Sequence, residues 1–234
     1  MSCKDVFRQS TFFDRKEHQY STDLILNPPL HTTLEINAII NKIVGLNSMD
    51  YVVDFGAGSG RITIPLLKNN FYVYAIDVSK RSLENLRKTA KKLLLHSLET
   101  ATSLPRNRKF KALVGADILH HIELNKYLPK IFNSLEKGGK VIFSEPCAFN
   151  LAWYIYLPIA SNWKLERGLI NCTYSNLKNT FEKHGFKNVT ISGLGLLPRP
   201  FFNWSKKLCK LNDWLGNLPI LKLFSYRYII EATK

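Results

Sequence analysis

One segment, Val53–Gly60 (VDFGAGSG), limits the possible folds of this chain more than any other part of its sequence. An apolar run over 51–55 leads into a glycine-rich loop, and a helix-like segment begins directly after it. Glycines let a backbone turn tightly and approach a ligand without a Cβ in the way, and the N–H groups at a helix start can face a polar or anionic group. The next apolar run ends in an acid, Asp77, which can accept hydrogen bonds from a ribose diol. We therefore expect a strand, turn, helix and strand that bind a nucleotide.

The rest of the chain repeats this alternation of strands and helices. Short apolar runs predict strands, and apolar residues at i, i+3, i+4 and i+7 predict helices. Alternation with short connections builds a parallel sheet covered by helices on both faces. The expected strands cover 51–55, 71–77, 112–116, 140–143, 186–191 and 225–232, with a further strand or a helix end over 92–95. The expected helices cover 36–44, 61–67, 79–94, 124–135 and 175–183.

The charge of the chain allows three interpretations. Among 234 residues, 33 Lys and Arg stand against 18 Asp and Glu, which gives a formal net charge of +15. Such a charge suits a solvated lysine-rich surface, an anionic substrate or lipid surface, or nucleic acid. The basic residues are spread along the chain and no RNA-binding module is recognisable, which argues against nucleic acid.

Cysteine usage and apolar content indicate a cytoplasmic protein. The four cysteines lie far apart and form no C-x-x-C pair, so we expect reduced thiols and no metal site. The N-terminal residues lack the apolar core of a secretion signal. No apolar run reaches the roughly 18 residues that a membrane span needs.

The glycine loop favours a nucleotide without a pyrophosphate. The dinucleotide fingerprint G-x-G-x-x-G has a glycine at the position that Arg61 occupies here. Asp54, two residues before the first glycine, suits a ligand with a cationic head group. Both features argue against a nicotinamide-dependent oxidoreductase.

Four segments resemble motifs of the class I S-adenosylmethionine-dependent methyltransferases, in that family's order. Val53–Gly60 resembles motif I, 75–79 (AIDVS) resembles the acid motif of the second strand, and 114–122 (VGADILHHI) resembles the fourth-strand motif. The segment 135–143 (LEKGGKVIF) resembles the helix end, glycine turn and fifth strand that follow. The resemblance implies an α/β fold. It would be one Rossmann-like domain over 1–234, with a seven-stranded, mostly parallel sheet, helices on both faces and an antiparallel last strand.

The resemblance also implies that the cofactor is S-adenosylmethionine. Asp54 would lie near its amino-acid end, Asp77 would hold the ribose hydroxyls, and Val78 would lie against the adenine. Either Glu99 or Thr100 would contact the adenine amino group. The implied cofactor-binding residues are Tyr20, Asp54, Gly56, Ala57, Gly58, Gly60, Asp77, Val78, Glu99 or Thr100, Gly115 and Ala116.

Two histidines and one acid are the candidates for catalysis. His120 and His121 follow the fourth strand, near the place that the family gives to the methyl group. Histidine titrates near neutral pH and can take a proton from an acceptor. Alternatively, one of the two caps the next helix or packs against the cofactor. Glu145 follows the fifth strand and either orients a histidine, binds substrate or is a plain rim acid.

Two segments, 146–172 and 193–225, interrupt the alternation and contain all four tryptophans. Together with an N-terminal lid over 1–33, they are expected to cap the substrate site, the alternative being a small satellite core.

The second cap segment also predicts an amphipathic helix with lysines opposite an apolar stripe. We expect the stripe to pack on the domain, to wall an apolar pocket or to touch an anionic membrane. The stripe consists of Trp204, Leu208, Leu211, Leu215 and Leu218.

These features together predict an S-adenosylmethionine-dependent methyltransferase. Its acceptor would be the oxygen, nitrogen or carbon of a small, apolar or lipid-like molecule. One alternative is a methyltransferase acting on RNA or protein, which only the charge supports. Another is an enzyme of the same fold that binds the cofactor without transferring its methyl group.

Overall fold

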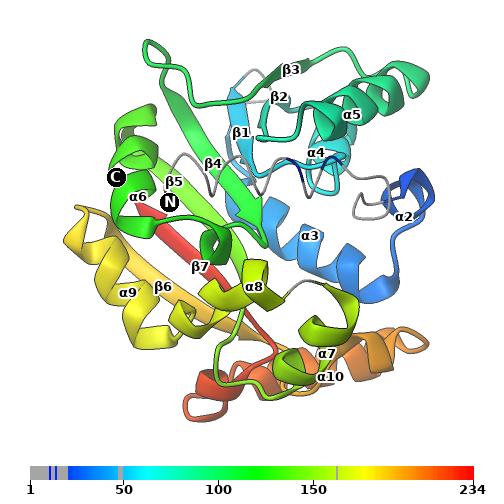
Figure 1. The fold of residues 1–234 in the computed structure, drawn as a ribbon, viewed down its shortest axis with the longest axis vertical. Helices are drawn as coiled ribbons and strands as arrows, with labels where there is room; N and C mark the ends of the chain where they lie inside the picture. Colours follow the sequence, from blue (N-terminus) through cyan, green and yellow to red (C-terminus); the bar gives the residue numbers. More distant parts are fainter. Residues whose placement is uncertain (1–10, 12–13, 15–20, 47–49, 162) are drawn as a thin grey trace.

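A seven-stranded sheet forms the centre of the computed structural model, which describes residues 11, 14, 21–46, 50–161 and 163–234 (Figure 1). The strands are β1 Tyr51–Phe55, β2 Tyr72–Ile76, β3 Leu98–Ala101, β4 Phe110–Ala116, β5 Leu135–Pro146, β6 Lys187–Leu194 and β7 Arg227–Thr233. Their order is β3-β2-β1-β4-β5-β7-β6. β7 runs antiparallel to both of its neighbours, and the other pairs are parallel. This confirms the predicted Rossmann-like sheet and its antiparallel last strand.

Helices cover both faces of this sheet. α3, α4 and α5 bury their apolar sides in one cluster, and α6 and α9 bury theirs in the other. The helices are α2 Thr22–Leu26, α3 Leu30–Ile43, α4 Thr63–Lys68, α5 Lys80–Lys92, α6 Leu124–Ser134, α7 Ala152–Ala160, α8 Trp163–Glu166, α9 Tyr174–Lys183 and α10 Lys206–Gly216. Short 3₁₀ turns are η2 Leu119–His121, η3 Arg167–Asn171, η4 Arg199–Phe202 and η5 Leu221–Phe224.

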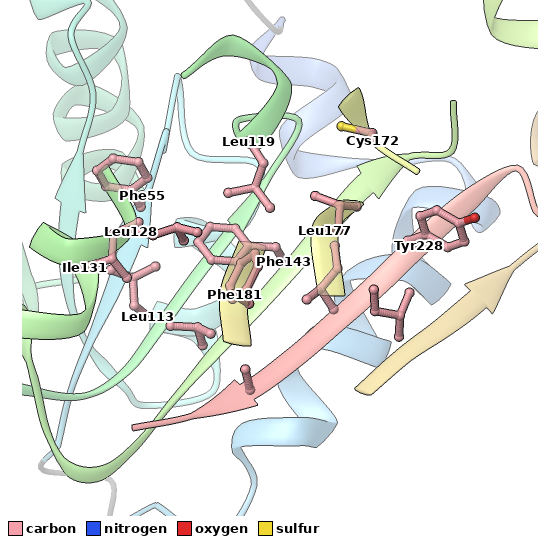
Figure 2. Packing of buried hydrophobic residues seen from close by; sticks show 14 of the residues in the cluster. Phe55, Leu113, Leu119, Leu128, Ile131, Phe143, Cys172, Leu177, Phe181 and Tyr228 are labelled. Atoms are coloured by element: carbon pink, nitrogen blue, oxygen red, sulfur yellow. The ribbon is translucent and has the colours of Figure 1, made fainter. Parts of the chain in front are cut away.

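β1 shows how the strands serve both clusters. Successive side chains of a strand point to opposite faces, so Val52 joins the cluster under α3 while Val53 and Phe55 join the cluster under α6 and α9. Figure 2 shows the second cluster, in which Phe143 of β5 and Phe181 of α9 lie together. Strands buried on both faces are apolar throughout, which is why they were visible in the sequence.

Several bounds differ from the predicted ones; α3 begins at Leu30 and β5 at Leu135, both earlier than predicted. Two further differences have a clear physical cause. α5 ends at Lys92, and the third strand begins only at Leu98, because Leu94 takes a left-handed φ of +57° in the turn between them. α6 ends at Ser134 and does not reach the glycine pair, since Leu135 is already extended and buried as the register partner of Phe110. Packing against the neighbouring strand decides this second boundary.

The apolar stripe predicted for the second cap segment is only partly buried. Leu211 of α10 is 50% exposed and Trp204, which precedes the helix, is 77% exposed. The other three stripe residues are half-buried, namely Leu208, Leu215 and Leu218. The fully buried residues of α10 lie on a neighbouring, partly polar face and are Cys209, Asn212 and Gly216. Of the three predicted alternatives, packing of the whole stripe on the domain is therefore not what the structure shows.

Asn212 explains how a polar residue can hold this helix in place. Its Oδ1 accepts hydrogen bonds from the backbone N–H groups of Leu196 and Leu197 at 3.1 and 3.0 Å. Its Nδ2 donates to the Leu197 carbonyl at 2.9 Å. The Asn212 amide thus forms hydrogen bonds with three backbone groups of the loop after β6. Buried polar groups need such partners.

Two neighbouring substitutions test this packing. Asn212→Ala leaves the backbone groups of Leu196 and Leu197 without their partner, so we expect it to lower the free energy of unfolding by about 2–3 kcal/mol. Leu211→Ala removes an exposed side chain and should cost less than about 0.5 kcal/mol. Urea unfolding of both variants gives the comparison, and a larger loss for Leu211→Ala would contradict the packing described.

Candidate active site

A cavity of about 410 Å³ opens at the carboxyl ends of β1, β2 and β4. Parallel sheets bind ligands at this edge, and the volume is within the range of small-molecule sites. The glycine loop after β1, the ends of β2 and β3 and the segment after β4 supply its walls. The predicted site residues on these walls are Asp54, Gly56, Ala57, Gly58, Asp77, Val78, Ala116 and His121.

Asp77 holds the glycine loop in shape. Its Oδ2 accepts the Gly58 N–H at 2.7 Å, and its Oδ1 accepts the Ser79 N–H at the start of α5 at 2.8 Å. Gly58 has a left-handed φ of +52°, and a Cβ built there would meet no atom within 4 Å. Because Gly58 lies on the cavity wall, that open space belongs to the ligand cavity.

Asp54 is a buried acid beside the loop. The Thr63 hydroxyl donates to its Oδ2 at 2.6 Å, while its Oδ1 has no hydrogen-bond partner among the described residues. Burial raises the pKa of Asp54 to about 6, although the Thr63 hydrogen bond works in the other direction. A cationic group near Oδ1 would favour the charged carboxylate.

Neither candidate for the adenine contact lies on the cavity wall. Glu99 forms an ion pair with Arg108 at 2.8 Å, and the Thr100 hydroxyl accepts from Arg87 at 2.8 Å. The cavity is lined instead by 102–104, directly after β3. Glu99 and Thr100 lie three and two residues before the first of these lining residues, and their predicted contact with adenine stays a prediction.

Two further predicted cofactor residues, Gly60 and Gly115, also lie away from the cavity wall. A Cβ at Gly60 would come within 2.6 Å of Leu86, and a Cβ at Gly115 within 2.9 Å of the Phe143 ring. Both glycines allow close packing beneath the site. Tyr20 lies outside the described residues.

His120 is buried between two carboxylates behind the cavity. Its Nδ1–H donates to Glu145 Oε2 at 2.6 Å, and its Nε2–H donates to Glu166 Oε2 at 3.1 Å. Burial by itself would lower the pKa of His120, but the charges and hydrogen bonds of the two carboxylates raise it to about 10. Glu145 Oε1 also accepts the N–H groups of Ile118 and Leu119, each at 2.7 Å, which fixes the segment after β4.

His121 is the histidine on the cavity wall. Its Nδ1 lies 3.3 Å from the Leu165 carbonyl, and its Nε2 lies 3.8 Å from Glu166 Oε2. Since a carbonyl only accepts, Nδ1 carries the proton of the neutral ring and Nε2 carries the lone pair. Burial, and then repulsion from the protonated His120, lowers the pKa of His121 to about 4. The two ring centroids are 4.0 Å apart. At neutral pH the site therefore holds a charged His120 beside a neutral His121.

The contacts of His120 are those of a buried ion pair. Two groups of described residues have donor atoms close enough together for a metal ion, and both include His120. A metal would have to displace one of the two protons that His120 shares with Glu145 and Glu166.

Asp117 is a site residue to which the sequence analysis gave no role. It follows β4 with a left-handed φ of +55° and lies on the cavity wall. Arg61 contacts its Oδ2 at 2.5 Å and Arg227 of β7 contacts its Oδ1 at 2.7 Å. Burial opposes the charged form, but the two guanidinium groups hold the pKa of Asp117 well below its ordinary value. Asp117 lies inside the fourth-strand motif and was within reach of sequence reasoning, whereas nothing near Arg227 signals its role.

Glu166 is the other residue that the sequence analysis missed. It lies in α8, far from His120 in the chain, and reaches it because η3 packs closely on η2. Gly168 permits this approach, since a Cβ there would lie 1.7 Å from the His120 carbonyl oxygen. No short-range pattern signals such a contact.

Comparison with known proteins agrees with this geometry. A family described as a methyltransferase domain matches residues 52–139, from β1 into β5. This match covers the segment whose motifs resemble those of the class I S-adenosylmethionine-dependent methyltransferases. An uncharacterised methyltransferase of Anoxybacillus flavithermus is 29% identical over 163 residues, which cover 63% of this chain and 74% of that protein.

Solved methyltransferase structures share the fold at low sequence identity. Phosphoethanolamine N-methyltransferase 2 of Haemonchus contortus, in complex with S-adenosyl-L-methionine, has a TM-score of 0.70 and 16% identity over 96% of this chain. This chain spans only 59% of that enzyme. Geranyl diphosphate C-methyltransferase of Streptomyces coelicolor has a TM-score of 0.69 and 12% identity, covering 100% of this chain and 99% of the other. Magnesium protoporphyrin IX methyltransferase of Synechocystis has a TM-score of 0.62 and 14% identity, covering 98% and 99%.

The residues that line the cavity fit S-adenosylmethionine. The partnerless Oδ1 of Asp54 would favour the cofactor's ammonium group nearby, and the open space at Gly58 is where a ligand can approach the backbone. Each oxygen of Asp77 accepts one backbone N–H and keeps lone-pair capacity for a ribose hydroxyl.

Gly58→Ala tests the contact between loop and cofactor. The new Cβ would occupy the cavity, so we expect S-adenosylhomocysteine to bind at least about tenfold more weakly, a loss of about 1.4 kcal/mol. Gly138→Ala is the matched control, because Gly138 also has a positive φ and open space around it but lies outside the cavity. Calorimetry with S-adenosylhomocysteine and with NADH measures both affinities. Unchanged affinity in folded Gly58→Ala, or tighter binding of NADH, would contradict the assignment.

The raised pKa of His120 predicts a pH-dependent stability. Its folded pKa of about 10 exceeds the ordinary 6.5, so its contribution is complete below pH 6.5 and is lost as the pH rises toward 10. His120→Asn should therefore cost about 3–5 kcal/mol near pH 6.5, and the difference from the native chain should shrink toward pH 10. His96→Asn, an exposed position, should show no such trend. Urea unfolding across this range gives the result, and a pH-independent difference would be incompatible with a charged His120.

Proposed function

We propose that this protein transfers a methyl group from S-adenosylmethionine to a small, apolar or lipid-like acceptor, and that His121 takes the acceptor's proton. One observation carries the proposal: a neutral histidine lies on the wall of the same cavity as the glycine loop, Asp54 and Asp77. A base is needed beside the methyl donor when the acceptor is a hydroxyl or an acidic carbon, and less so for an amine.

Bound S-adenosylmethionine supplies a methyl group on a positively charged sulfur. An acceptor atom that takes this methyl group would lose one proton to His121 Nε2, while the bond between methyl carbon and sulfur breaks and its electron pair stays on the sulfur, which becomes neutral. The charged His120 beside it keeps His121 unprotonated beforehand, while Glu145 and Glu166 hold His120 in place. In this scheme Glu145 and His120 are positioning residues, and His121 alone of the three predicted catalytic residues would touch the substrate.

The walls of the cavity support an acceptor with an apolar part. The cavity that His121 lines is also lined by Phe55, Ile118, Ile122 and Tyr127, which offer apolar surface. The cations Arg61 and Lys130 also line it and suit a polar or anionic end of the acceptor. The related structures named above carry names of small-molecule acceptors, namely phosphoethanolamine, geranyl diphosphate and magnesium protoporphyrin IX.

The cap segments and the compartment complete the proposal. We place 146–172 and 193–225 as substrate caps and 1–33 as an N-terminal lid on one domain that spans 1–234. Support for the first cap comes from α8, whose Leu165 carbonyl bonds His121 and whose Glu166 bonds His120. Buried, free Cys147, Cys172 and Cys209 agree with the reducing cytoplasm.

His121→Asn tests the proton transfer. With labelled S-adenosylmethionine and a lipid or metabolite extract as the source of acceptors, we expect its single-turnover rate to fall about 10²-fold or more, with cofactor affinity nearly unchanged. The same measurement on His96→Asn should match the native chain, because His96 is exposed. Equal rates for His121→Asn and the native chain would refute the role of His121.

The pH profile adds an independent check. A base must be unprotonated to act, so the native rate should stay level as the pH falls toward 5 and drop only as it approaches the lowered pKa of about 4. A decline centred at the ordinary histidine pKa of 6.5 would contradict a pKa of His121 lowered by burial and by the charge of His120.

A further inference from the structure

The exposed apolar side chains of this protein are concentrated at one end of the chain. Among the described residues, seventeen large apolar side chains are strongly exposed. Thirteen of them lie between Phe149 and Phe224, and the other four are Leu24, Val44, Val78 and Leu94. Scattered single residues of this kind are ordinary, whereas a concentration marks an interaction surface.

α7 presents one row of this surface. Leu151, Ile155 and Ile159 are spaced by four residues and are 76%, 69% and 82% exposed. The opposite side of the helix is anchored in the protein, where Trp153 stacks on Tyr226 with ring centroids 4.3 Å apart. The anchored side leaves the aliphatic row pointing to solvent.

α10 presents a second row, flanked by cations. Its buried side is the Asn212 face, so Leu211 and Trp214 point outward, the latter 60% exposed. Successive residues of a helix are 100° apart, which places Lys207 and Lys210 on either side of Trp214. Both lysines are exposed.

Side-chain contacts join the two rows into one surface. The Asn150 side chain, just before α7, donates to the carbonyls of Leu196 and Phe224 at 3.0 and 2.8 Å, the two ends of the segment that contains α10. The exposed rings of Phe149 and Phe224 lie with centroids 6.2 Å apart. Figure 1 shows α7 and α10 at the same end of the molecule, opposite α5.

The lysines of this surface have no free acidic partner within 196–224, so its charge is positive. Between 196 and 224 the acid is Asp213, and it is engaged in a two-pronged ion pair with the buried Arg199, at 2.8 and 3.1 Å. Lys206, Lys207 and Lys210 thus add net positive charge beside the exposed tryptophans.

We propose that this cap surface, formed by Leu151, Ile155, Ile159, Leu211, Trp214 and Lys206–Lys210, binds the face of an anionic lipid bilayer. Aromatic and aliphatic side chains suit the boundary between head groups and acyl chains, and the lysines suit lipid phosphates. A second copy of the chain fits less well, because a symmetric contact would bring the same lysines against one another and bury their charge. No helix among the described residues has the length and apolarity to cross a bilayer.

The position of this surface links it to the cavity. α7 is followed directly by α8, whose Leu165 carbonyl bonds His121 on the cavity wall. A bilayer held against α7 would present lipid-like molecules at the side of the protein where the cap covers the site. This corollary alone rests on the proposed function; binding to the bilayer does not.

Co-sedimentation with vesicles tests the proposal on the full chain. We expect binding to vesicles of equal parts phosphatidylglycerol and phosphatidylcholine, weakening as salt rises, and little binding to phosphatidylcholine alone. Replacing Lys206, Lys207 and Lys210 by Gln should lower the partition coefficient roughly 100-fold, at about fivefold per lysine. Ile155→Ser with Ile159→Ser should also lower it while keeping the salt dependence of what binding remains.

A charge-matched control separates this surface from the general charge of the protein. Lys80, Lys91 and Lys92 are exposed lysines of α5 at the opposite end of the molecule (Figure 1), and their triple Gln variant should bind vesicles nearly as well as the native chain. An equal loss in both triple variants, no binding at low salt, or a dimer in sedimentation that disappears with Ile155→Ser would overturn the proposal. S-Adenosylhomocysteine affinity is measured on every variant. If a variant loses vesicle binding but keeps its affinity for S-adenosylhomocysteine, the bilayer proposal and the proposed methyl transfer are tested independently.

Discussion

The charged hydrogen bonds of His120 organise the active-site region. This one ring connects Glu145 at the end of β5, the segment after β4 and Glu166 of the cap. Breaking a buried pair by removing one partner typically costs about 3–5 kcal/mol, so the three elements are tied together strongly. The same charge lies against His121 and keeps that histidine neutral. The ion pairs of His120 with Glu145 and Glu166 therefore also help to lower the pKa of His121, the histidine on the cavity wall.

A second set of buried charges secures the other side of the site. Arg227 of β7 contacts Glu35 of α3 at 3.2 Å and Asp117 at 2.7 Å, and Arg61 reaches Asp117 from the turn between the glycine loop and α4. The left-handed backbone of Asp117 is a strained conformation that persists where the surroundings hold it, and here two guanidinium groups do so. Residues from both ends of the chain thus fix the segment that carries both histidines.

The cap shows a different balance of forces. α7 and α10 are held by a few specific contacts, such as the Trp153 indole that donates to the Tyr226 carbonyl at 2.6 Å and the Asn212 amide. Their large apolar residues are left outside. Burial inside the protein therefore does not explain why α7 and α10 carry these large apolar residues. The bilayer proposal gives these residues a place where burial of their surface is favourable.

The sequence by itself determined the sheet, its flanking helices, the glycine loop and the acid of β2, because these follow from local rules. Strand and helix periods, the φ freedom of glycine and the capping of α5 by Ser79 all act within a few residues. Only the tertiary structure decided which histidine faces the cavity, that Glu166 pairs with its neighbour, and that 102–104, rather than Glu99 and Thr100, line the wall. It also decided which side of α10 is fully buried, since helical periodicity identifies an apolar stripe but not what covers it. These features depend on contacts between residues far apart in the chain, whose distances arise only when the elements are packed.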